Sequence, residues 1–249
     1  MWDDAKQLHA VAAGLALIAA GALLLGALAW LARQPAFEFR EIVVTKPLEH
    51  ANAAQLEAVI RQELAGTFFT MNLDRARAAL AQVPWVRGVA LRRQWPHRLE
   101  VAVHEHLPLA RWNDNGLVDE DGEVFTADYL GDLPQFEGPD GRAAEVALRY
   151  REWAPPLAAL SMAVREVRLS PRGGWHLRAA GAAGPLDIEL GREDPAERLA
   201  RFVAAYGRTV GALARAGTRI DHVDLRYRNG FAARVPGFRE RPPKKAARW

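Results

Sequence analysis

The sequence predicts a single N-terminal transmembrane helix followed by an α+β chain with an open sheet and packed helices. Two observations support this fold class. Ala10–Ala32 contains no charged, amide or hydroxyl side chain. At about 1.5 Å per residue, a helix of that length extends about 34 Å and exceeds the roughly 30 Å of a hydrocarbon core. The residues that follow alternate strand-like runs of period two with amphipathic helical runs, which is typical of an α+β protein.

Two other interpretations of this apolar run are less consistent with its length and pattern. Ala27-Leu28-Ala29 fits the small-x-small pattern of a cleavable signal peptide. Such peptides, however, hold only about 7–15 apolar residues. A buried helix of a soluble protein normally carries a polar stripe, and this run has none. We therefore expect residues 1–9 to form a short leader and residues 10–32 to span the membrane.

The composition excludes several classes of site. The chain has no cysteine, which excludes disulfides, thiolate metal ligands and cysteine nucleophiles. The formal net charge of +3 comes from the Arg- and Lys-rich segment Arg239–Trp249. The rest of the chain therefore lacks the basic excess that is typical of a nucleic-acid-binding domain. We expect a disordered basic tail at 239–249, and neither a nucleic acid nor a small-molecule substrate as a partner.

Residues 37–106 predict a small module of the order strand, helix, helix, strand, strand. Phe37–Val44 alternates and ends in β-branched residues, which predicts the first strand. Asn52 and Asn72 each precede an amphipathic run and are expected to cap two helices. Trp85–Trp95 and Leu99–Glu105 alternate again, with a Pro-containing turn between them. A hairpin with two helices on one face predicts an α+β module.

Residues 107–238 predict a second, β-rich domain. Leu117–Phe125 is typical of a hairpin, in which Asp121-Gly122 is expected to supply the positive φ angles of a type I′ turn and the acidic residues to be solvated. A helical stretch follows, with a break expected at Pro155-Pro156. Further strands are predicted at Val164–Leu169, Gly174–Arg178 and Leu186–Leu190.

A helix start and a final hairpin complete this domain. Asp194-Pro195-Ala196-Glu197 combines an N-cap residue, Pro at the first helical position and Glu at the third. Val223–Tyr227 and Phe231–Val235 predict two strands joined by an Asn229-Gly230 hairpin turn. As the last strand, Phe231–Val235 is expected at a sheet edge, where unpaired backbone groups can receive a strand from a partner.

No residue pattern predicts catalysis or a cofactor. The two serines, Ser161 and Ser170, lie outside a nucleophile elbow, and the sequence has no P-loop, dinucleotide fingerprint or zinc-protease motif. His104 and His106 share a strand face without an evident third ligand, so surface or packing roles are favoured over a metal site. We therefore expect no enzyme activity, no catalytic residue, no metal and no cofactor.

Several segments resemble one family of bacterial proteins. Pro84-Trp85-Val86, Arg92-Arg93-x-Trp95-Pro96, Pro108-x-Ala110-x-Trp112 and Asp224-Leu225-Arg226-Tyr227 are similar to segments of the FtsQ/DivIB cell-division family. The similarity covers nearly the whole chain. It implies a POTRA module at 37–106, of the order β-α-α-β-β, followed by a β domain at 107–238.

The resemblance also implies a binding surface. In this family the C-terminal strands bind a short segment of FtsB, which forms a complex with FtsL. Arg226 is expected to meet a partner carboxylate and Tyr227 to offer an aromatic contact, while the strand backbone pairs with the partner. Carried over by position, the surface comprises Arg226, Tyr227, Asn229, Gly230, Phe231 and Val235, with Arg172 as a second charge contact.

In function, the resemblance implies a non-enzymatic scaffold of the divisome that links early and late division proteins and helps to control septal peptidoglycan synthesis. It implies a place in the bacterial inner membrane at the septum, with a cytoplasmic N-terminus and a periplasmic bulk. Other division proteins are expected at the POTRA module and the membrane helix. An alternative is a POTRA-bearing envelope transport or assembly factor. A membrane-tethered wall hydrolase would need a nucleophile or metal set that the sequence does not show.

Overall fold

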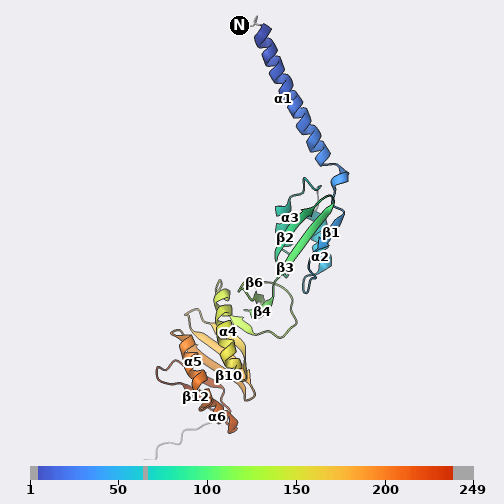
Figure 1. Ribbon diagram of the computed structural model, residues 1–249. Coiled ribbons are helices and arrows are strands. Elements are labelled where there is room, and N and C mark those ends of the chain that lie inside the picture. The colour runs from blue at the N-terminus through green and yellow to red at the C-terminus, as the bar shows by residue number, and fades with distance from the viewer. Residues whose placement is uncertain (1–4, 64–66, 238–249) are drawn as a thin grey trace, which may run out of the picture. The chain divides into compact units, whose positions relative to one another are not determined.

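The structure, a computed structural model, describes residues 5–63 and 67–237 (Figure 1). The contacts divide the chain into two units, Met1–His106 and Leu107–Trp249. The tail expected at 239–249 lies outside the described residues.

The N-terminal helix α1 (Ala5–Ala32) is long and apolar enough to cross a membrane. Its leucines, such as Leu17 and Leu23, are exposed. Apolar side chains all around a helix suit a lipid environment, because a helix packed on a soluble core shows them on one face only. Within the part of the chain that the structure describes, α1 is the one helix with these properties.

The small unit has the predicted order of elements. After a 3₁₀ turn, η1 (Pro35–Phe37), the strands form a sheet of order β1-β3-β2, with β3 antiparallel to β2 and parallel to β1. The first strand begins at Glu41 rather than at Phe37, because the Phe37 N–H bonds to the Gln34 carbonyl in the 3₁₀ turn. The elements are β1 (Glu41–Val44), α2 (Ala53–Glu63), α3 (Leu73–Leu80), β2 (Val86–Gln94) and β3 (Arg98–Glu105).

Both predicted helix caps of the small unit are confirmed. The Asn72 Oδ1 accepts the backbone N–H groups of Asp74 and Arg75, each at 3.0 Å. The Asn52 Oδ1 accepts the Ala54 N–H at 2.9 Å. Each asparagine thus satisfies amide groups that the first turn of a helix leaves without a partner. The helices bury their apolar faces against the sheet, as residues Leu56, Ile60, Leu80, Leu99 and Val101 show.

The large unit is a mixed sheet of nine strands, in the order β12-β11-β10-β9-β8-β7-β4-β5-β6. The strand pairs β4–β7, β7–β8 and β10–β11 are parallel, and the other pairs are antiparallel. Together with α1 and the small unit, this sheet confirms the predicted fold class. Its elements are β4 (Pro108–Trp112), β5 (Gly116–Asp119), β6 (Val124–Phe125), β7 (Gln135–Glu137), α4 (Ala143–Ala158), β8 (Met162–Leu169), β9 (Trp175–Gly181), β10 (Gly184–Gly191), α5 (Pro195–Tyr206), α6 (Val210–Arg215), β11 (His222–Asp224) and β12 (Ala232–Arg234).

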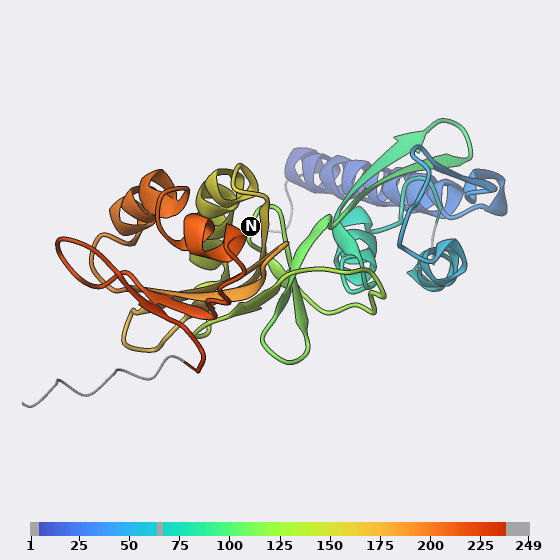
Figure 2. The ribbon, with the colours of Figure 1, turned by 90° about the horizontal axis from the view of Figure 1, so that it is seen from below.

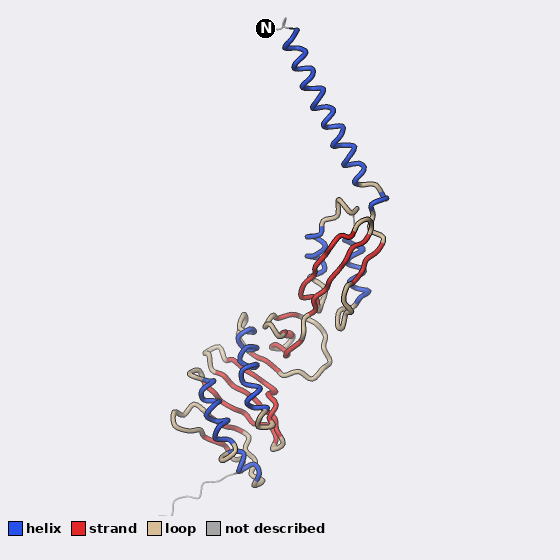
Figure 3. The backbone as a smooth tube through the Cα atoms, in the orientation of Figure 1, coloured by secondary structure: helices blue, strands red, loops and turns tan. Residues whose placement is uncertain are grey.

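One face of the large sheet carries the core. Helices α4, α5 and α6 lie over this face (Figures 2 and 3). Trp153 of α4 packs edge-on against Trp175 of β9, with ring centroids 5.2 Å apart, and Phe202 of α5 is fully buried. Strands β8, β9 and β10 alternate buried and more exposed residues, as strands with a single buried face do.

A row of ion pairs links the side chains of neighbouring strands β7 to β10. Arg168 bonds to Glu137 and to Glu166, each at 2.6 Å. Arg178 lies 3.1 Å from Glu166 and 2.7 Å from Asp187. The hydrogen bonds that Arg168 donates to Glu137 and Arg178 donates to Asp187 raise the pKa of both guanidinium groups. Apart from Glu166, which is buried, the side chains of this row are partly exposed, so those pairs contribute little to stability.

The turn between β5 and β6 differs from the sequence prediction. In the β5–β6 hairpin only Gly122 has a positive φ, of 85°, so the predicted type I′ turn at Asp121-Gly122 is wrong. The Asp119 Oδ1 instead accepts the N–H groups of Asp121 and Glu123, at 3.0 and 2.8 Å. Asp119 is buried rather than solvated, because its carboxylate organises the turn from inside.

Two helix predictions in the large unit also need correction. Helix α4 continues through Pro155-Pro156 to Ala158, because the prolines lie in its last turn and remove few hydrogen bonds there, while Trp153 and Leu157 hold the helix on the core. Helix α5 begins at Pro195 as predicted. The Asp194 side chain makes no capping bond, however, because this residue adopts a left-handed conformation with a φ of 46°.

Replacing Asn72 tests the cap of α3. We expect Asn72→Ala to lower the free energy of unfolding of the small unit by about 1 kcal/mol, because two amide groups lose their acceptor. Asn72→Ser, which keeps a capping oxygen, is the control and should stay close to the parent. Chemical denaturation of the full chain, followed by hydrogen exchange in α3, measures both. Equal stability of the Ala and Ser variants would contradict the prediction.

Candidate partner-binding edge

Strand β12 forms one end of the large sheet. It pairs antiparallel with β11, in the register His222 to Arg234, Val223 to Ala233 and Asp224 to Ala232. No strand among the residues that the structure describes pairs with its other side. The predicted sheet edge is therefore present, although the strand is shorter than the predicted range Phe231–Val235.

The hydrogen bonds of β11 show which backbone groups of β12 face outward. The Asp221 carbonyl and the Leu225 N–H bond to β10, at 3.0 and 2.9 Å. Backbone groups alternate sides along a strand. The backbone N–H and C=O groups of His222 and Asp224 therefore point toward β12, where these residues are opposite Arg234 and Ala232. The N–H and C=O of Ala233 then point to the open side. A partner strand could bond to these groups without displacing β11.

The residues that flank β12 fasten it to the core. Phe231 packs edge-on against Phe202 of α5, with ring centroids 5.5 Å apart. Val235 is half-buried and packs against the same core cluster. Both were expected at the binding surface. The structure shows that part of each side chain is already engaged within the domain, so their main effect is to hold the edge strand in place.

Arg226, just after β11, forms an ion pair with Asp224, the last residue of that strand. Its Nε and Nη2 donate to the two carboxylate oxygens of Asp224, at 2.9 and 2.7 Å, and its backbone N–H bonds to the same side chain. The guanidinium lowers the pKa of Asp224 below its usual value of about 3.9, and the carboxylate raises the pKa of Arg226. Both groups are therefore charged at neutral pH, and the Arg226 guanidinium is already bonded to Asp224 within the domain.

A second ion pair fixes the other end of β12. The Arg234 Nε donates to the Asp221 Oδ1 at 2.8 Å. This hydrogen bond lowers the pKa of the Asp221 carboxyl. A carboxyl with a lowered folded-state pKa adds stability above its unfolded pKa, and that contribution disappears as the pH falls through the folded value. The Asp221–Arg234 pair therefore links the two strands at neutral pH, and because both side chains are partly exposed its contribution to stability is small.

The loop between β11 and β12 corrects the predicted hairpin turn. Asn229 and Gly230 both have negative φ angles, so they do not form the two-residue turn that the sequence predicts. A longer connection, residues 225–231, joins the strands instead. It places Tyr227 at the surface, with 57% of its area exposed, together with Arg228, Asn229 and Gly230. Tyr227 is therefore a surface residue rather than part of the core.

Arg172 lies in the turn between β8 and β9, where Gly173 has a φ of 83°. The strand registers place this turn at the same end of the sheet as the last residues of β10 and β11. Gly191, which ends β10, leaves room for Arg226, because a Cβ there would lie 2.9 Å from the Arg226 Cγ. Arg172 and Arg226 therefore lie at the same end of the sheet.

The sequence analysis missed a small cavity beside the loop. Its volume is about 240 Å³, and it lies between α5 and residues 225–231. Its lining combines arginine side chains with the rings of Phe202 and Phe231. The helical spacing of Arg198 and Arg201 beside buried Phe202 is the signal that could have indicated it. The lining residues include Arg198, Arg201, Phe202, Leu225, Arg228 and Phe231.

Comparisons with known proteins agree with this architecture. The profile "Cell division protein FtsQ/DivIB, C-terminal" matches residues 110–226, and "POTRA domain, FtsQ-type" matches residues 37–106. The chain is 40% identical to the cell division protein FtsQ of Burkholderia pseudomallei, over 96% of each chain. It is 36% identical to FtsQ of Bordetella pertussis, over 99% of this chain and 96% of that protein.

A more distant relative is FtsQ of Escherichia coli, with 35% identity over 73% of this chain and 65% of that protein. The matched domains account for most of the chain, and residues 227–235 of the edge lie just beyond the C-terminal FtsQ/DivIB match. The apolar helix α1 and the match to the FtsQ relatives indicate a single-pass membrane protein. The chain belongs to the FtsQ/DivIB family of cell division proteins.

Proposed function

We propose that this protein is a non-enzymatic scaffold of the divisome that binds an FtsB-type segment, in complex with an FtsL-type protein, along β12. The observation that supports the proposal is the open side of β12, which among the residues that the structure describes pairs with β11 alone. A partner strand added there gains main-chain hydrogen bonds, and the neighbouring side chains provide specificity.

The side chains around this edge are suited to binding. Tyr227 offers an exposed ring, and Asn229 and Gly230 lie beside it on the same exposed loop. Arg226, Arg228 and the more distant Arg172 supply positive charge, which complements an acidic partner. These groups bind the partner through hydrogen bonds, an aromatic contact and charge, and they break no covalent bond.

The membrane helix contributes to the scaffold by confining the protein to a surface. We propose that residues 1–9 lie in the cytoplasm and that both folded units lie in the periplasm, at the inner-membrane septum. Partners anchored in the same membrane then meet the edge at a high effective concentration. Other division proteins bind the POTRA module and the helix. In this way the protein links early and late division proteins and helps to control septal peptidoglycan synthesis.

A proline at the centre of the edge tests strand addition. We expect Ala233→Pro to weaken binding of an FtsB-type peptide at least tenfold, because the outward N–H is lost while the bonds to β11 remain. Ala233→Val, which keeps the N–H, is the control. Fluorescence anisotropy of a labelled peptide with the full chain in detergent measures both. Undiminished binding by the proline variant would rule out pairing along β12.

Truncating Tyr227 tests the aromatic contact. We expect Tyr227→Ala to cost about 1–2 kcal/mol of binding, because the loss of an exposed ring removes an interface contact without opening the core. Leu148→Ala, which truncates a side chain of similar exposure (55%) on α4, should leave binding unchanged. The same titration reports both values, and thermal unfolding should be unaffected in each. A fall in stability with Tyr227→Ala would instead indicate a packing role.

Reversing the charge of Arg226 tests the acidic partner contact. We expect Arg226→Glu to reduce binding more than tenfold, because two carboxylates would then face the partner acid. Arg151→Glu is the matched control, since Arg151 is exposed on α4 and the change in net charge is the same. Binding at two salt concentrations separates a local contact from general attraction. An equal loss of affinity in the two variants would show that Arg226 makes no specific contact with the partner.

A further inference from the structure

Aromatic rings gather at one end of the small unit. Phe37 lies edge-on to Phe69, with centroids 5.2 Å apart, and Phe69 lies edge-on to Phe68 at 5.3 Å. Phe39 adds a fourth ring, 6.0 Å from Phe68. The cluster is open to solvent rather than buried: Phe69 is 54% exposed, and the other three rings are half-buried. Rings of this kind contribute little to the core of the unit.

This cluster is joined directly to the end of α1. The Thr67 Oγ1 donates to the carbonyl of Ala32, the last residue of the helix, at 2.5 Å. The Phe68 N–H bonds to the Phe37 carbonyl at 2.7 Å. Phe37 itself follows Ala32 by five residues, so it stays within about 18 Å of the helix end even in an extended chain. The rings must therefore lie close to the level at which α1 leaves the bilayer.

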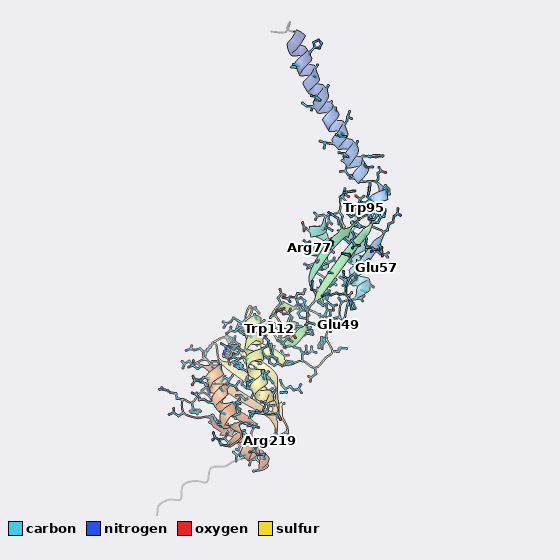
Figure 4. The ribbon with its side chains drawn as sticks, viewed as in Figure 1. Glu49, Glu57, Arg77, Trp95, Trp112 and Arg219 are labelled. Carbon is cyan, nitrogen blue, oxygen red and sulfur yellow. The ribbon has the colours of Figure 1, made fainter. Side chains whose placement is uncertain are left out.

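Trp95 lies at the same end of the small unit. It is 73% exposed, in the turn between β2 and β3. That turn is tied to the start of β1, because the His97 carbonyl accepts the N–H of Arg40 at 2.9 Å. Figure 4 shows Trp95 at the end of the small sheet where the chain enters from α1. Two separate loops thus present large exposed rings at the membrane-proximal end.

The chemistry of this end matches the lipid–water interface. Tryptophan and other aromatic rings favour the headgroup level of a bilayer, and nearby arginines attract lipid phosphates. Arg33 and Arg40, both exposed, flank η1 between the helix and the first strand. Trp30, in the last turn of α1, is exposed as well. The span and this surface are continuous, so the bilayer that holds α1 is also the surface nearest to the rings.

We propose that this end of the small unit, which we define as the aromatic foot (Phe68, Phe69 and Trp95), inserts into the headgroup region of the membrane that α1 crosses. Phe69 and Trp95 enter the interface, while Arg33 and Arg40 bind phosphates. The foot gives the small unit a second point of attachment besides the chain itself. Its contact with lipid would therefore limit how freely the POTRA module turns on its tether.

The natural absence of cysteine makes a depth measurement possible. Single cysteines replace Phe69, Trp95 or, as a control at the other end of the unit, Glu49, which is also exposed (Figure 4). Each is labelled with a polarity-sensitive fluorophore in the full chain, reconstituted in nanodiscs of phosphatidylethanolamine and phosphatidylglycerol. Lipids that carry a nitroxide near the headgroup then report contact. A further variant, Ala36→Cys in η1, keeps every ring in place.

We expect the labels at 36, 69 and 95 to show blue-shifted emission and to lose at least half of their intensity to the nitroxide lipid. The label at 49 should behave as in water. Adding Phe69→Glu to the Trp95→Cys protein should reduce quenching at least twofold, whereas Arg77→Glu, on the exposed side of α3, should not. Circular dichroism checks that each variant is folded.

Two outcomes would overturn the proposal. If the labels at 36, 69 and 95 match the label at 49, the foot stands clear of the lipid. If their emission is blue-shifted without nitroxide quenching, protein covers the rings, which would assign this surface to a second copy of the chain. Neither outcome affects the binding edge at β12, because the peptide titrations can be made in detergent without a bilayer.

Discussion

The open edge of the large sheet depends on the parallel pairing of β11 with β10. A parallel pair needs a crossover, and here helices α5 and α6 provide it on the core face. The chain therefore arrives at the outer side of β10 with one short strand still to form, and β12 turns back against β11 as the end of the sheet. With an antiparallel β10–β11 hairpin the crossover helices, and the cavity that α5 forms with the loop, would be absent.

The edge is open but held in place. The Phe231 ring packs on Phe202, Val235 packs on the same core, and Arg234 of β12 pairs with Asp221. A strand that is already straight and in register loses little conformational entropy when a partner joins it, which favours binding by preorganisation. The same contacts show that affinity and domain stability share residues here. For that reason, Tyr227 and the outward backbone of Ala233 report on binding more cleanly than Phe231 does.

Features that depend on neighbouring residues could be predicted from the sequence, whereas features that depend on tertiary packing could not. Asn52, Asn72 and Pro195 mark helix starts through contacts within one turn, so the sequence alone identifies them. Pro155-Pro156 misled because packing of Trp153 and Leu157 outweighs a local helix breaker. Asn229-Gly230 favours a tight turn, but residues 225–231 form a longer loop, in which Phe231 packs on Phe202. The cavity depends on the tertiary placement of α5 beside residues 225–231, which no spacing rule reveals.

The shortness of β12 also bears on solubility. Unpaired strand edges can pair with the edges of identical copies, and long, flat, apolar edges do so most readily. Here the strand has three residues, and its last is a cationic arginine. Two copies meeting edge to edge would gain few hydrogen bonds and would bring like charges together. Such a short edge strand disfavours self-association. It is therefore bound most readily by a partner that makes further contacts outside the strand.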